Sequence, residues 1–171
     1  NLNTTGTANT AVGEKALRFN STASNNTAIG QLALGKNTTG ASNTAVGSLS
    51  LDANTTASNC TAVGISALSS NTTGENNTAF GSQALADNTT ATANTAVGHA
   101  ALFENTTGAQ NTAVGKSAAV NTTTASNVTA LGYLALGDNT TGTQNTAVGN
   151  LAAWVTGGLQ RQTRTIVPDS A

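Results

Sequence analysis

Few residues in this sequence could do chemistry, and they do not recur together. The one histidine, His99, stands where equivalent positions carry glutamate, glutamine, serine, isoleucine or tyrosine, which is typical of a solvent-facing side chain. Acid–base and nucleophilic catalysis both need a second group beside the first. No paired carboxylates and no nucleophile–base set recur along the chain. We therefore expect no catalytic residue, no cofactor and no enzymatic activity.

Acidic side chains give the nearest approach to a metal site. Asp87, Glu104 and Asp138 occupy one region of a repeated segment, but Lys36 and Ser70 occupy equivalent positions. A hard cation would need several oxygen ligands that converge. The pattern indicates a solvated acidic fringe, and we expect no metal ligands.

Cys60 and the Asn-x-Thr sequons could carry covalent links. Cys60 stands where most equivalent positions have asparagine. A small replacement inside the fold is the favoured interpretation, and an interchain disulfide is the other. The sequons, such as those at Asn37, Asn54 and Asn71, follow from a repeated word and need not be glycosylated.

All of these residues belong to a strict 17-residue repeat. One unit reads N-T-A-V-G-x-x-A-L-x-x-N-T-T-G/A-x-x, and we number its positions 1 to 17. Position 5 is glycine in nine units without insertion or deletion, at Gly13, Gly30, Gly47, Gly64, Gly81, Gly98, Gly115, Gly132 and Gly149. Such a register is typical of stacked structural units. Threonine and valine favour extended structure, and no apolar stripe of helical period is present.

The repeat therefore predicts an all-β fold, a β-solenoid (parallel β-roll or β-helix) of 17-residue repeats with a 34-residue super-period. We expect two short strands per unit and a rod of roughly 43 Å, since stacked strands lie about 4.8 Å apart. The solenoid should cover residues 1–155, with Trp154 plugging the core. Residues 156–171 depart from the repeat and would form a cap, a linker or an assembly segment.

Positions 4 and 9 are expected to form a thin apolar core. Because positions 3 and 4 are both apolar, one of two strand faces would be an outer apolar column, either tolerated in solvent or packed on another chain. The predicted core residues are Val12, Leu17, Ile29, Leu34, Val46, Leu51, Val63, Leu68, Phe80, Leu85, Val97, Leu102, Val114, Leu131, Leu136 and Val148.

Position 15 alternates between glycine and alanine without exception. Glycine permits a left-handed turn that alanine disfavours. Either successive single-unit coils alternate their turn geometry, or one coil spans two units and stacks glycine on glycine. The small core favours 17-residue coils. The predicted turn glycines are Gly6, Gly40, Gly74, Gly108 and Gly142.

The composition of the chain argues against two kinds of partner, nucleic acid and the membrane interior. Charged residues make up 8% of the chain, the net charge is −1, and aromatic residues are 3%. No basic patch follows a phosphate backbone, so nucleic acid is not expected. No apolar run is long enough to predict a membrane span.

The phrase N-T-A-V-G-x-x-A-L resembles the head repeats of trimeric autotransporter adhesins. It is more similar to the N-T-A-x-G-x-x-A-L-x-x-N-T-T-G arrays of bacterial surface fibres and phage tail fibres. The resemblance covers residues 1–155. It implies a parallel β-roll, usually trimeric, that acts as a stalk or adhesive head outside the cell or on a virion. The adhesin-head repeat is shorter than the unit of this chain, so the coil shape does not carry over.

We therefore expect a structural or adhesive segment of an extracellular fibre, a homotrimer that could meet a cell-surface glycan or protein receptor through its variable positions. The first alternative is a self-assembling filament subunit with end-to-end coil stacking. The second is an ice-binding β-solenoid, since threonine columns can order water. The adjacent threonines at positions 13 and 14 count against it, because only one of them can face outward.

Overall fold

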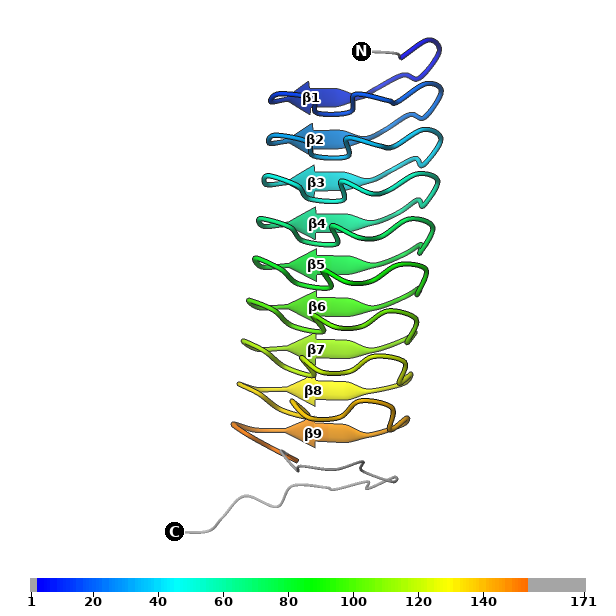
Figure 1. Ribbon diagram of the computed structural model, residues 1–171. Coiled ribbons are helices and arrows are strands. Elements are labelled where there is room, and N and C mark those ends of the chain that lie inside the picture. Colours follow the sequence, from blue (N-terminus) through cyan, green and yellow to red (C-terminus); the bar gives the residue numbers. More distant parts are fainter. Residues whose placement is uncertain (1–2, 154–171) are drawn as a thin grey trace.

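The computed structural model describes residues 3–153, and these form one stack of coils (Figure 1). Each coil contributes one strand to a parallel sheet in which every strand pairs with the next in chain order. The strands are β1 (Thr10–Val12), β2 (Thr27–Ile29), β3 (Thr44–Val46), β4 (Thr61–Val63), β5 (Thr78–Phe80), β6 (Thr95–Val97), β7 (Thr112–Val114), β8 (Thr129–Leu131) and β9 (Thr146–Val148). The β-solenoid with 17-residue spacing is therefore confirmed.

The expectation of two strands per unit is wrong, because only positions 2 to 4 are extended. The rest of each coil is a series of turns with left-handed backbone at positions 7, 9 and 17, as in Leu32 (φ 60°), Leu34 (φ 50°) and Asn25 (φ 62°). The left-handed residues bend the chain sharply. These bends allow a unit of only 17 residues to close into a coil around a narrow core.

The core contains positions 3, 8 and 9. Leu34, Ala28 and Ala33 have no exposed surface. Neighbouring positions 8 and 9 both point inward because the left-handed residues break the alternation of a strand. The prediction for position 9 is confirmed at its predicted leucines, Leu17, Leu34, Leu51, Leu68, Leu85, Leu102 and Leu136.

The prediction for position 4 is wrong, because these side chains point away from the core. Val12 is 57% exposed and Phe80 is 56% exposed. The alanine at position 3, in the middle of each strand, is buried from β2 onward. Leucine and asparagine already fill the coil, so only alanine fits on the inner strand face. The residues placed outside are Val12, Ile29, Val46, Val63, Phe80, Val97, Val114, Leu131 and Val148.

Two columns of buried asparagines accompany the apolar core. At position 12 each amide donates to the preceding coil, as Asn54 Nδ2 does to Asn37 Oδ1 at 2.8 Å, and also to the position 15 carbonyl of its own coil. At position 1 each Oδ1 accepts a backbone N–H of the following coil, as Asn26 does from Asn43 at 2.9 Å. Buried amides need such partners, and here the neighbouring coils supply them at most levels. We call these columns the asparagine ladders.

The ladders have interruptions between the seventh and eighth coils. Thr122 replaces asparagine at position 12, and Val128 replaces it at position 1. Below Asn105 no amide is present to donate, so Asn105 Oδ1 is buried without a hydrogen-bond partner. The same level carries Ala119 in place of leucine, and both Ala119 and Val128 belong to the apolar core.

The alternation at position 15 has a steric cause rather than a conformational one. Gly40 has no left-handed φ, and it lies against Ala57 of the next coil, not Gly74. A Cβ on Gly40 would lie 2.2 Å from the Ala57 carbonyl oxygen. The preference for 17-residue coils is confirmed, and the expected left-handed turn at these glycines is wrong.

Each glycine lets the next coil approach at this corner of the stack. In the interior, the position 12 bond is 2.8 Å from a glycine coil to an alanine coil, at Asn37–Asn54 and at Asn71–Asn88. From an alanine coil to a glycine coil the distances are 3.0, 3.2 and 3.1 Å. The strand bonds do not alternate, since both Thr27 N–H to the Asn43 carbonyl and Thr78 N–H to the Asn94 carbonyl span 2.8 Å. The 34-residue super-period of the sequence is thus visible in the interior position 12 bonds.

A shallow hollow opens at the N-terminal end of the stack. It is lined by Asn3, Asn9, Ala11, Leu17 and Asn20, which are the ladder and core positions of the first coil. The predicted cap residue Trp154 and the tail 156–171 lie outside the described residues. Within the described residues, no helix could span a membrane.

Candidate functional site

The most regular surface of the described chain is the outer face of the sheet, which we call the sheet face. It contains positions 2 and 4 of every coil, because alternate residues of a strand point to the same side. Position 2 is threonine in all nine strands, at Thr10, Thr27, Thr44, Thr61, Thr78, Thr95, Thr112, Thr129 and Thr146. Position 4 is the outer apolar column. The sheet face therefore carries two uncharged residues from every strand.

The threonine hydroxyls of the sheet face have no partner among the described protein groups. Those at position 13 behave differently, since Thr38 Oγ1 donates to the Thr55 carbonyl at 2.9 Å and Thr55 repeats the bond to Thr72 at 3.1 Å. One threonine column is thus consumed in holding coils together, while the other presents free hydroxyls. The sheet face can be recognised in the sequence from positions 2, 3 and 4, which are threonine, alanine and an apolar residue. In a strand, positions 2 and 4 lie on one side and position 3 lies on the other.

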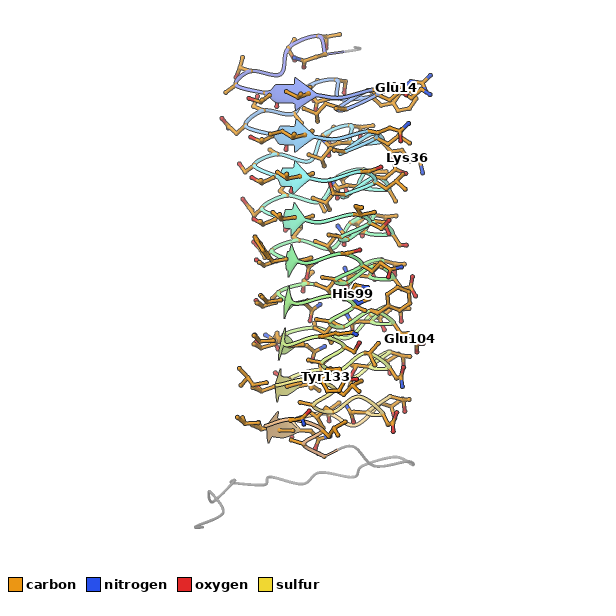
Figure 2. All side chains as sticks on the ribbon, turned by 90° about the vertical axis from the view of Figure 1, so that its left-hand side faces the viewer. Glu14, Lys36, His99, Glu104 and Tyr133 are labelled. Carbon is orange, nitrogen blue, oxygen red and sulfur yellow. The ribbon has the colours of Figure 1, made fainter. Side chains whose placement is uncertain are left out.

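The sheet face is continuous along the whole stack. Figure 1 shows the strands one above another from β1 to β9, and in the turned view of Figure 2 the arrows change direction gradually from the first strand to the last. Sheets of many strands normally twist in this way. The asparagine ladders join the same side chains of successive coils, so they help to keep neighbouring strands in register behind the outer face.

The charged residues lie elsewhere. Figure 2 shows Glu14, Lys36 and Glu104 on the side of the stack away from the strands. Two ion pairs form among the described residues, Lys15–Glu14 at 3.0 Å and Lys36–Asp52 at 3.4 Å. Hydrogen bonds to the Glu14 carboxylate from Lys15, and then from Gln31, lower the pKa of Glu14. These are surface pairs, which contribute little to stability.

The polar candidates from the sequence do not form a site. His99 is exposed, and Asp87 and Asp138 are half-buried in separate coils. Asp138 accepts from Asn121 Nδ2 at 3.2 Å. Among residues 3–153, His, Cys, Asp and Glu nowhere gather in a group of three or more that could hold a metal ion. Of the three acidic residues singled out from the sequence, Glu104 is the exposed one.

The sequons at Asn37, Asn54 and Asn71 cannot be glycosylated in the folded chain. All three side chains are fully buried, and their amides are members of a ladder. A glycan would have to replace these bonds and leave through the core.

Cys60 occupies a ladder position. Its side chain has no exposed surface, and Sγ lies 3.3 Å from the Gly74 carbonyl oxygen, where an asparagine amide would donate. An interchain disulfide is therefore incompatible with the folded coil, and the replacement of asparagine by a small residue is the interpretation that fits. Burial raises the pKa of the Cys60 thiol, and the backbone N–H groups of Asn77 and Asn76 offset part of that rise.

We expect the Cys60 thiol of the folded protein to resist a disulfide reagent such as Ellman's reagent at pH 8. The raised pKa keeps the thiol neutral, and burial blocks access. The group favours folding below the ordinary thiol pKa, and this contribution is lost as the pH rises further, because the unfolded chain ionises first. Absorbance during reaction with and without urea checks this. Rapid reaction without urea would contradict the burial of Cys60.

The fold and the sheet face define this chain as a β-solenoid repeat protein. No family model, no curated protein and no solved structure matches it.

Proposed function

We propose that this chain is a structural and adhesive segment of an extracellular fibre. The observation that carries the proposal is the continuity of the stack, in which strand pairing and the backbone geometry repeat through nine coils. Hydrogen bonds across every coil-to-coil step suit a rod that transmits force along its axis. Each step repeats the last, so force meets no differently built domain between the third and the 153rd residue.

Adhesion would use the exposed variable positions. Positions 6, 7, 10, 11, 16 and 17 change from coil to coil, and they carry the charged side chains, such as Lys116 and Glu104. Repeated shallow contacts from such positions suit a cell-surface glycan or protein receptor that is itself extended. The buried positions barely vary, so ligand contacts could change without a change in the rod.

The homotrimer stays a prediction. Trimer formation would need an apolar surface, and the outer column at position 4 is the one that continues through every strand of residues 3–153. Burying the sheet face in a dry contact would also bury nine free threonine hydroxyls, and each hydroxyl left without a partner costs about 1–3 kcal/mol. A sheet-face trimer therefore has to pair these hydroxyls between chains or retain water.

Mass measurement in solution, together with electron microscopy, tests the fibre proposal. We expect rods, either as trimers at three times the 16.7 kDa chain mass or as end-to-end polymers. A monodisperse monomer at micromolar concentration would contradict both assembly states. As a matched pair, Val97→Asp on the sheet face should weaken a trimer that uses this face, and Thr90→Asp at exposed position 14 should not.

A further inference from the structure

We propose that the sheet face binds ice, with the free threonine hydroxyls and the neighbouring methyl groups holding an ordered layer of water. This inference goes beyond the fibre proposal, because it needs only one folded chain. The proposed ice-binding residues are those at positions 2 and 4. The threonines at positions 13 and 14 are adjacent, so they cannot both face outward.

The first argument is geometrical. Hydroxyls of one column repeat at the coil spacing, about 4.8 Å, and the apolar column runs beside it about 6.6 Å away, two residues along the strand. The register is the same at every step, from Thr10 against Thr27 to Thr129 against Thr146. The coil spacing is close to the repeat of oxygen atoms along one axis of hexagonal ice. The constant register repeats this spacing from each strand to the next through all nine strands.

The second argument concerns what each column can bond. The hydroxyls at position 13 are occupied by the neighbouring coil, whereas those at position 2 are free. Each free hydroxyl can donate one hydrogen bond and accept others from water. The methyl groups of threonine and valine cannot, so water beside them must bond to other water. Alternation of the two kinds of group favours an ordered, ice-like layer over a dry contact.

The third argument is the position of the charges. Within the described residues no charged side chain belongs to the sheet face, and the labelled charges of Figure 2 lie away from it. Ionic groups orient their own hydration shells, which compete with a lattice. A macromolecular partner would more commonly be met by a mixed polar and charged rim.

Substitution of Phe80 distinguishes an ice surface from a protein partner as the ligand of the sheet face. Its ring stands on β5, the middle strand, and is 56% exposed among valines. In a protein interface, a central aromatic residue is the expected energetic anchor. Against an ice plane its ring protrudes beyond the side chains of Val63 and Val97, with which Phe80 pairs. Phe80→Val should therefore raise ice activity, whereas it should weaken a chain–chain contact.

The test is thermal hysteresis and retention on an ice-coated cold finger, with the purified chain and four variants. We expect activity above the buffer value for the wild type and for Thr90→Lys, loss of most activity for Thr95→Lys, and a gain for Phe80→Val. Thr90 is an exposed threonine outside the sheet face and serves as the matched control. Thermal unfolding followed by circular dichroism confirms that each variant is folded, and Thr95→Ser retains the hydroxyl if Thr95→Lys does not fold.

Absence of hysteresis and ice retention in the wild type would overturn the inference, as would equal losses from Thr95→Lys and Thr90→Lys. Sedimentation of the same samples separates the two proposals. An inactive wild type that is trimeric, with Phe80→Val dissociating it, would reject ice and leave the fibre proposal intact. An active monomer would support ice binding and reject the assembled fibre.

Discussion

Gly81→Ala is expected to destabilise the solenoid by about 4 kcal/mol. Two causes add. Gly81 has a φ of 140°, a conformation that L side chains rarely adopt, and an added Cβ would lie 2.5 Å from the Gly98 carbonyl oxygen. Backbone of the next coil cannot turn aside as a side chain can. Urea unfolding followed by circular dichroism measures the loss.

Gly35→Ala is the matched control for Gly81→Ala. Its φ is not left-handed, and its new Cβ would first meet a carboxylate oxygen of Asp52, at 2.8 Å, which can rotate away. The same position carries alanine at Ala86 and phenylalanine at Phe103. We expect a change within about 1 kcal/mol there. Equal unfolding midpoints for the two variants would refute the account of position 5.

Asn88→Ala should cost about 3 kcal/mol, because it removes a rung from a buried ladder. Asn88 Nδ2 donates to Asn71 Oδ1 at 2.8 Å, and Asn88 Oδ1 accepts from Asn105 Nδ2 at 3.1 Å. The substitution removes the donor to Asn71 Oδ1 and the acceptor of Asn105 Nδ2. Both of these side chains are fully buried, so water does not replace the lost bonds. Calorimetry or urea unfolding gives the magnitude.

Thr122→Asn is the control for Asn88→Ala, because it is expected to stabilise the folded chain. Thr122→Asn would place an amide below Asn105, whose Oδ1 is buried without a partner. It gives up the bond from Thr122 Oγ1 to the Asn139 carbonyl, at 2.9 Å. A net stabilisation of about 1 kcal/mol is expected, as is common for a return to the repeat consensus. If Asn88→Ala were neutral and Thr122→Asn destabilising, the ladders would not be the source of stability.

The repeat predicted the solenoid well because a register without insertions has few structural solutions. It also predicted Leu34 and its equivalents as core. It failed where local conformation departs from a strand. Left-handed residues such as Leu32 and Leu34 cannot be anticipated from propensity, since leucine rarely adopts that conformation. Their effect is to bury Ala33 and Leu34 together, which leaves no room for valine at position 4.

The sheet face could have been found from the sequence and was not. Thr27 and Ile29 are two residues apart, so a strand places them on the same side whichever side is buried. Size alone predicts the larger side chain, at position 4, as core. In so short a coil the interior is already filled by leucine and asparagine, so the smaller residue is the one that fits.

The alternation of glycine and alanine at position 15 has a consequence for how such a chain can change length. Loss of a single 17-residue coil would place glycine on glycine or alanine on alanine at one corner, whereas the present corners place glycine against alanine, as Gly40 lies against Ala57. Loss of two coils leaves every corner as it was. The rod can therefore lengthen or shorten without a new kind of corner only in steps of two coils, which are 34 residues and about 9.6 Å of rod.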